Sequence, residues 1–222
     1  MNIDSTHITQ INPKHRDQWP NPTVAITGML GSGKSTVTRI LAEKKFPVID
    51  CDKLAHTVTE YGSQGFERVV NLFGSEILKP DGTLNRAMIL AKILRDQEAH
   101  KALEKIVHPL VLEALDTSLM QLAAGGEKTA IVEVPLLFES GWHRLFDLNC
   151  MVTAPESVCI ARIMARNRVD EETAHQWLKL QMPTEIKIRM ADCLIRNDHT
   201  LDDLKREVEL LYQKLSCYPG TQ

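Results

Sequence analysis

The chain has 222 residues and a mass of 25.0 kDa, which is enough for one substantial α/β domain that carries an insertion. Hydrophobic residues make up 43% and charged residues 25% of the chain, a balance typical of globular proteins and unlike that of a disordered chain. The 26 basic residues are outnumbered by 29 acidic ones, and the net charge of −3 provides no basic field for holding a nucleic acid.

The five cysteines are widely spaced and include no Cys-x-x-Cys pair, which argues against a disulfide framework and against a zinc site. The first 22 residues are polar and lack the apolar run of a secretory signal. No segment approaches the roughly 20 apolar residues of a membrane span. We therefore expect a cytoplasmic protein without a membrane partner, in which residues 1–22 form a flexible extension.

Five short apolar runs are typical of strands, because they are bounded by turn or helix signals and are apolar on both faces. They lie at residues 24–27, 47–50, 130–134, 149–153 and 194–195. Helical spacing of apolar residues predicts helices over 34–45, 155–167, 171–181 and 201–215, and further helices from 65 to 122. This alternation indicates a parallel sheet with right-handed crossovers. We expect an α/β core, residues 23–60 and 128–222, interrupted by a helical insertion over 61–127.

Residues 28–35 read Gly-Met-Leu-Gly-Ser-Gly-Lys-Ser and fit the pattern G-x-x-x-x-G-K-[S/T] in full. The pattern follows a predicted strand and opens a predicted helix, where inward-facing N–H groups and the helix dipole favour phosphate. Lys34 is expected to reach the β- and γ-phosphates and Ser35 to bind Mg²⁺. The alternative is a glycine-rich turn with a solvated lysine. The expected nucleotide-binding residues of the loop are Gly31, Ser32, Gly33, Lys34, Ser35 and Thr36.

The rest of the sequence narrows the class of nucleotide-binding protein. An Asn-Lys-x-Asp guanine motif is missing, which argues against a GTPase. The best candidate for an apolar strand ending in Asp, as motor and helicase ATPases have, instead reads Ile-Val-Glu-Val-Pro at 131–135. A small-molecule kinase is therefore the leading class.

Two carboxylates, Asp50 and Asp52, follow the second predicted strand at the sheet edge where open α/β folds bind ligands. With Asp50-Cys51-Asp52 taken as the end of that strand, alternation sends the side chains of Asp50 and Asp52 to the same side. A carboxylate there can accept the proton of an attacking hydroxyl or hold the magnesium shell. The alternative is a solvated strand end or a cap of the next helix.

Four segments together resemble the dephospho-coenzyme A kinase family. They are the loop 28–36, Val-Ile-Asp-Cys-Asp at 48–52, His108-Pro109, and Val-Pro-Leu-Leu-Phe-Glu at 134–139. The resemblance covers residues 24–215 and implies transfer of the ATP γ-phosphate to the ribose 3′-hydroxyl of dephospho-CoA, the last step of coenzyme A synthesis. It also implies a P-loop kinase fold similar to the nucleoside monophosphate kinases, with a five-stranded parallel sheet flanked by helices, a helical CoA-binding insertion, and a lid at residues 166–190.

The resemblance also implies roles for acceptor-side residues. Asp52 is the expected catalytic base, and Asp50 is expected to orient the substrate or bind the metal. Because the residue before a proline is biased away from helix, we expect a new helix to begin at Pro109. The other expected substrate-binding residues are Arg86, His108, Pro135, Leu136 and Glu139. For these residues the alternative, that the side chain packs in the core or is solvated without touching the substrate, remains open.

Arg162 and Arg166 lie four residues apart on a predicted helix and share one face, with Arg168 just beyond. The absence of a carboxylate from Arg162 to Arg168 indicates a site for the γ-phosphate when a lid closes, and Arg166 is the first candidate for stabilising the transferring group. The alternative is a solvated basic face. Similarity to the family adds Arg189 as a second phosphate candidate and Asn197 near adenine.

Two other functions remain open at this stage. One is a nucleoside or nucleotide kinase with a different acceptor, and the other is a sensor that binds ATP without transferring phosphate. The sequence leaves the choice between a monomer and a homo-oligomer undecided.

Overall fold

The structure is a computed structural model that describes Trp19 and residues 21–216. The predicted extension over 1–22 therefore lies almost wholly outside the described residues. The chain divides into two compact units. The sheet unit contains the described residues up to Ile49 and from Leu119 onward, and the helical unit contains Asp50–Ser118.

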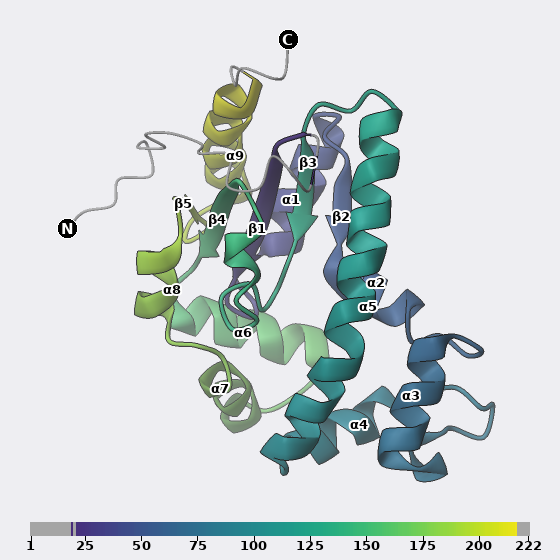
Figure 1. The fold of residues 1–222 in the computed structure, drawn as a ribbon. Helices are drawn as coiled ribbons and strands as arrows, with labels where there is room; N and C mark the ends of the chain where they lie inside the picture. Colours follow the sequence, from purple (N-terminus) through teal and green to yellow (C-terminus); the bar gives the residue numbers. More distant parts are fainter. Residues whose placement is uncertain (1–18, 20, 217–222) are drawn as a thin grey trace. The chain divides into compact units, whose positions relative to one another are not determined.

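The sheet unit is built on five parallel strands (Figure 1). Their bounds are β1 Thr23–Gly28, β2 Val48–Asp50, β3 Ala130–Glu133, β4 Leu148–Thr153 and β5 Cys193–Arg196, in the spatial order β2-β3-β1-β4-β5. In the central register, Ala25 pairs with Val132 on one side and with Asn149 on the other. The five predicted strands and the five-stranded α/β fold class are confirmed.

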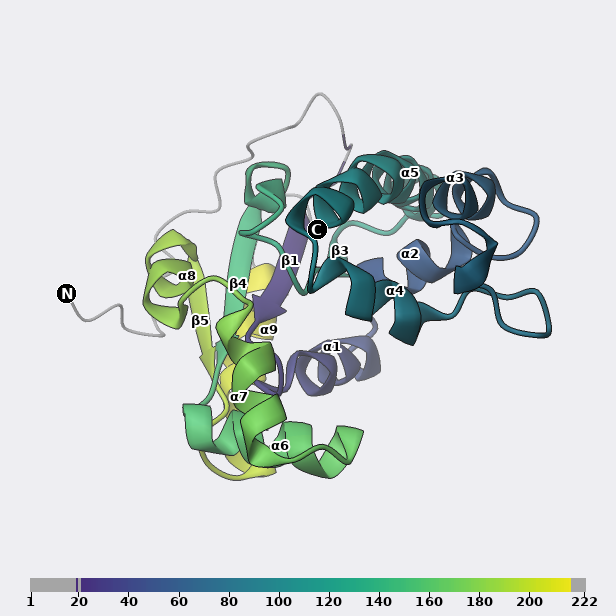
Figure 2. The ribbon, with the colours of Figure 1, turned by 90° about the horizontal axis from the view of Figure 1, so that it is seen from below.

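Helices flank this sheet, and two of them share one hydrophobic cluster with it (Figure 2). Val37 and Leu41 of α1 pack in that cluster with Val208 and Leu211 of α9 and with Ile26 of β1. The bounds of the helices of this unit are α1 Lys34–Glu43, α6 Glu156–Asn167, α7 Glu171–Lys179, α8 Thr184–Met190 and α9 Leu201–Ser216, with a short 3-10 turn η2 Trp142–Arg144. The core thus fixes β1 and α1, the two elements that the glycine-rich loop joins.

The helical unit has its own apolar core, in which Phe66, Ile77 and Ile89 are buried. Side-chain caps begin its short helices: Ser63 accepts from Phe66 N–H, and Asn85 accepts from Met88 N–H. The elements are α2 Cys51–Thr57, α3 Gln64–Phe73, η1 Ser75–Ile77, α4 Arg86–Ile93 and α5 Gln97–Ala124, which continues beyond the unit at its C-terminal end. None of the helices in the described part of the chain is long and apolar enough to cross a membrane.

The predicted continuation of β2 to Asp52 is wrong. The strand ends at Asp50, whose carboxylate accepts the N–H groups of Asp52 and Lys53 and thereby caps α2. These two bonds turn the backbone into a helix at Cys51. Asp52 is therefore in the first turn of a helix, and strand alternation does not determine the direction of its side chain.

The predicted start of a new helix at Pro109 is also wrong. α5 runs without interruption from Gln97 to Ala124 and contains Pro109 in its interior. A proline removes one helical hydrogen bond and costs about 3 kcal/mol or more there. Burial of the apolar face on both sides, by Ile106 and Val107 before Pro109 and by Val111 and Leu115 after it, offsets this cost.

Candidate active site

The glycine-rich loop, residues 28–33, connects the end of β1 to the first turn of α1. Gly31 has a φ of +79° and Gly33 a φ of +98°, a region that only glycine adopts without strain. A Cβ atom at Gly33 would lie 2.1 Å from Asn197 Nδ2, so a larger residue would also clash. The glycines therefore allow the backbone to wrap tightly at the helix N-terminus, where N–H groups favour an anion.

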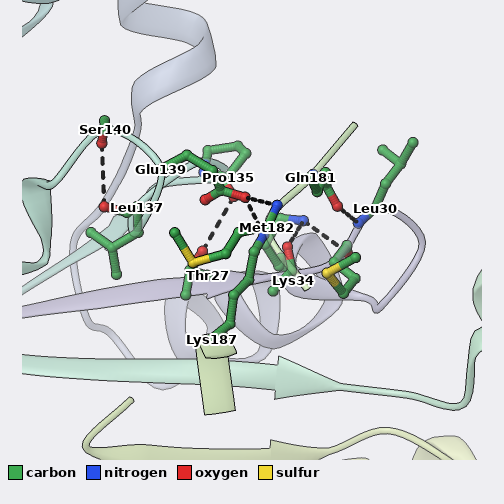
Figure 3. A network of polar contacts seen from close by, with 12 residues as sticks. Thr27, Leu30, Lys34, Pro135, Leu137, Glu139, Ser140, Gln181, Met182 and Lys187 are labelled. Carbon is green, nitrogen blue, oxygen red and sulfur yellow. Dashed lines mark hydrogen bonds and ion pairs between the residues drawn. The ribbon is translucent and has the colours of Figure 1, made fainter. Parts of the chain in front are cut away.

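Lys34 is the first residue of α1, and its side chain folds back over the loop (Figure 3). Its Nζ donates to Gly28 O at 3.0 Å and to Met29 O at 3.2 Å, and the residue is only 8% exposed. Carbonyl oxygens are weak partners for an ammonium compared with phosphate oxygens. The loop therefore holds a cation ready to exchange its backbone partners for a phosphate.

Two predicted nucleotide-binding side chains hold the carbonyl side of the loop. Arg162 Nη1 donates to Gly31 O at 3.2 Å and to Ser32 O at 3.3 Å. Asn197 Nδ2 donates to Ser32 O at 2.7 Å, and its Oδ1 accepts from Arg162 Nη2 at 3.4 Å. The structure thus brings Arg162 and Asn197 to the loop backbone, and a direct contact of either with nucleotide stays a prediction.

Glu133, at the end of β3, is a site residue that the sequence analysis missed. It is 7% exposed; its Oε1 accepts from Ser35 Oγ at 3.0 Å and its Oε2 from Thr38 Oγ1 at 2.7 Å. The signal for it in the sequence is an apolar strand that ends in an acid, with Glu133 where the strand of motor and helicase ATPases ends in Asp. The structure shows that this acid faces the serine of the phosphate loop.

A serine hydroxyl beside a buried carboxylate offers the hard oxygen atoms that Mg²⁺ prefers. In the described part of the chain, no group of three or more His, Cys, Asp or Glu side chains is placed to hold a metal ion alone. Ser35 and Glu133 therefore fit a magnesium ion that takes its other ligands from nucleotide phosphates and water.

On the helical unit, the predicted acceptor residues make local contacts. Asp50 caps α2 as described above, and Asp52 is exposed. Arg86, the first residue of α4, donates from Nη2 to Thr59 Oγ1 at 2.9 Å and to His56 O at 3.4 Å. Partial burial lowers the pKa of the Arg86 guanidinium, and nearby Glu60 offsets part of that effect.

The remaining predicted residues lie outside these clusters. Arg166 is exposed and donates from Nε to Asn167 Oδ1 at 3.1 Å. Arg189 is exposed and donates to Glu185 O at 3.2 Å. His108 is half-buried, and burial lowers the pKa of its imidazole although Glu104 raises it. Phosphate or acceptor contacts by Arg166, Arg189 and His108 stay predictions.

The segment after β3 combines buried and accessible side chains. The carbonyl of Pro135 accepts from Thr27 Oγ1 at 3.3 Å, which ties the segment to β1. Leu136 is 42% exposed, whereas Leu137 is fully buried. Glu139 accepts from Met182 N–H and pairs with Lys187 (Figure 3). Leu136 is thus accessible to a ligand, and the acceptor contacts expected of Pro135, Leu136 and Glu139 stay predictions.

A glycine-rich loop carrying Lys34 and Ser35, placed between a central parallel strand and the helix that follows it, defines the chain as a P-loop nucleotide-binding protein. The model of one protein family, described as dephospho-CoA kinase, matches residues 22–203. The chain therefore belongs to the dephospho-CoA kinase family, whose members are ATP-dependent kinases.

Individual relatives agree with this family. A dephospho-CoA kinase of Bacillus cereus is 35% identical over 188 residues, covering 85% of this chain and 94% of its own. The dephospho-CoA kinase of Carboxydothermus hydrogenoformans is 33% identical over 193 residues, covering 87% of this chain and 94% of its own.

Two solved structures resemble this fold and are more than 25% identical to the chain over the aligned residues. The crystal structure of TT1252 from Thermus thermophilus has a TM-score of 0.77 and 34% identity, covering 88% of this chain and 98% of that one. A dephospho-CoA kinase from Campylobacter jejuni has a TM-score of 0.64 and 28% identity, covering 87% of this chain and 96% of its own.

Proposed function

We propose that this protein transfers the γ-phosphate of ATP to the ribose 3′-hydroxyl of dephospho-CoA and thereby forms coenzyme A. The observation that carries the proposal is the set of Lys34, Ser35 and Glu133 around a glycine-rich loop in a chain of this family. Phosphoryl transfer requires little covalent chemistry from the protein, so positioning and charge neutralisation are the main tasks of such a site.

The residues of this chain divide these tasks. Lys34 neutralises charge on the β- and γ-phosphate oxygens, and the loop N–H groups bind the remaining oxygens. Asp52 accepts the proton of the 3′-hydroxyl as it attacks. Arg166 stabilises the transferring group when the lid, residues 166–190, closes, and Arg162 and Arg189 assist at the phosphates.

Magnesium is the proposed cofactor, held through Ser35 and Glu133, with Asp50 as an additional oxygen ligand. When bound, it neutralises charge on the β- and γ-phosphates. Arg86, His108, Pro135 and Leu136 are the proposed acceptor-binding residues, whereas the Glu139 carboxylate, also expected there from the sequence, is engaged by Met182 and Lys187. The helical unit is the proposed CoA-binding part.

The proposed setting of the reaction is the reducing cytoplasm. The four cysteines in the described part of the chain, Cys51, Cys150, Cys159 and Cys193, form no disulfide with one another, as expected in a reducing compartment. A nucleic acid is not expected as a partner, because the chain has a net charge of −3.

The experiment that tests the function compares dephospho-CoA with its 3′-deoxy analogue in the presence of Mg-ATP. We expect ADP formation and a product heavier by one phosphoryl group with dephospho-CoA. The analogue lacks the attacking oxygen, so it should inhibit competitively and gain no phosphate. Phosphorylation of the 3′-deoxy analogue would contradict the proposed acceptor position.

A further inference from the structure

The junction between α7 and α8 is tied to two other segments of the sheet unit by consecutive residues (Figure 3). Gln181 Oε1 accepts the N–H of Leu30 in the phosphate loop at 2.9 Å. The N–H of Met182, the next residue, donates to Glu139 Oε1 at 3.0 Å. The junction therefore bridges the phosphate loop and the segment that follows β3.

An ion pair between a buried lysine and a partly exposed glutamate strengthens the second of these ties. Lys187 of α8 is 0% exposed, and its Nζ lies 2.6 Å from Glu139 Oε1, the same oxygen that accepts from Met182. Taking an ammonium out of water costs several kcal/mol, so a buried lysine is held to the position of its counter-charge. Glu139 thus fixes both the start of the junction and the helix that follows it.

The opposite side of the loop is held independently. Arg162 and Asn197 bind the carbonyl groups of Gly31 and Ser32. In the part of the chain that the structure describes, the N–H of Leu30 has Gln181 as its side-chain partner. One edge of the loop thus depends on Arg162 of α6 and on Asn197, the residue after β5, and the other depends on the α7–α8 junction.

We propose that Glu139 and Lys187 are positioning residues for ATP binding: they hold the α7–α8 junction so that Gln181 keeps the Leu30 end of the phosphate loop in its binding conformation. Neither residue needs to contact the nucleotide for this role. The proposal rests on the loop binding ATP, as argued above, and it adds the residues that preorganise the loop. Preorganisation lowers the ordering cost that binding would otherwise have to meet.

The test measures the ATP dissociation constant by calorimetry without an acceptor, together with the KM for dephospho-CoA and the melting temperature. Gln181→Met keeps the side-chain length and removes the oxygen that accepts from Leu30. Lys187→Met keeps a buried apolar stem and removes the ion pair. Each single variant should weaken ATP binding about five- to tenfold, the scale of one lost hydrogen bond, and leave the KM for dephospho-CoA within about twofold.

The decisive variant combines Gln181→Met with Lys187→Met. If the ion pair acts through Gln181, both changes remove the same hold on the Leu30 N–H. The ATP dissociation constant of the double variant should then equal that of whichever single variant binds ATP less tightly. Lys44→Met is the matched control: it removes an ion pair with Glu209 at the other end of α1 and should leave ATP affinity unchanged.

Three results would overturn the proposal. Additive losses of ATP affinity in the double variant would mean that Lys187 acts separately from Gln181, for example on a phosphate. A raised KM for dephospho-CoA with unchanged ATP affinity would place Glu139 and Lys187 in the acceptor pocket. A lower melting temperature with unchanged ATP affinity would mean that the ion pair serves stability only, and this would also contradict the proposal.

Where Lys187→Met alone does not fold, Glu139→Gln with Lys187→Met removes both charges together, a change that is often neutral for stability. This charge-free variant then takes the place of Lys187→Met in the comparison with Gln181→Met and with the combined variant. Failure of the unmodified protein to bind ATP would instead refute the proposed function, so the two failures are distinguishable.

Discussion

The phosphate loop and the acidic turn at Asp50 both follow a strand, but they are held in different ways. Side chains from segments far away in sequence hold the loop: Arg162, Gln181 and Asn197 all bind its backbone. The turn is held locally, since Asp50 caps the helix that begins at the next residue. The proposed ATP site is therefore built by tertiary contacts, whereas the acidic end of the proposed acceptor site is built by local hydrogen bonding.

The largest effect should come from the ATP side. Lys34→Met removes the cation that the loop holds in place, and we expect kcat to fall by about 100- to 1000-fold at saturating ATP, because electrostatic stabilisation of the transferring group is lost. Steady-state ADP formation measures this effect, with Lys44→Met as the control for loss of a lysine. Normal turnover of Lys34→Met at saturating ATP would refute the assigned role.

On the acceptor side, Asp52→Asn should lower kcat by about 100-fold or more, since a carboxylate that accepts the hydroxyl proton is lost. The KM for ATP should change little, because the variant leaves the loop and its long-range partners intact. Asp116→Asn is a matched control, an exposed acid on α5 of the same unit. Near-full turnover of Asp52→Asn would remove Asp52 from the role of base.

A change at Glu133 sharpens the comparison, because this residue reaches the loop from β3. Glu133→Gln retains an oxygen for the hydroxyls of Ser35 and Thr38 but loses the charge. We expect the Mg²⁺ concentration needed for half-maximal rate to rise about 10- to 100-fold, as for other groups that support a metal ligand. A titration with Mg²⁺ at fixed ATP measures it, and an unchanged midpoint would exclude Glu133 from the metal site.

The smallest of these effects should appear at Arg86, which lies in the helical unit and is half-buried. Arg86→Met should raise the KM for dephospho-CoA about tenfold, the scale of one partly exposed charge-assisted hydrogen bond, and leave ATP affinity unchanged. Binding of ATP by calorimetry and initial rates at varied acceptor separate the two effects. A change in ATP affinity with an unchanged KM for dephospho-CoA would show that Arg86 acts on ATP binding and would contradict its assignment to the acceptor.

Sequence patterns were enough for the features that depend on local chemistry and on burial. Strands such as β1 and β4 are nearly continuously apolar because helices cover both faces, and the loop pattern requires glycine where φ is positive. The presence of five parallel strands and the identity of the loop therefore followed from composition and spacing, whereas the order of the strands in the sheet was not predicted. Family resemblance then supplied the acceptor.

The errors arose where tertiary or capping contacts outweigh local preference. The strand-like alternation expected from Asp50 to Asp52 fails because Asp50 caps α2, and Pro109 stays inside α5 because apolar packing continues on both sides. Glu133 was visible as an acid at a strand end, but only the fold shows that Ser35 and Thr38 face it. Contacts between distant segments such as Gln181 and Leu30 have no local pattern to predict them.

The most direct test of the account is Mg-ATP turnover with dephospho-CoA beside adenosine, AMP, shikimate and no acceptor, with the mass of every product recorded. We predict a gain of one phosphoryl group on dephospho-CoA alone. Transfer to a different acceptor would keep the phosphate-loop argument and contradict the proposed substrate, and ATP binding without transfer to any acceptor would contradict the kinase account itself.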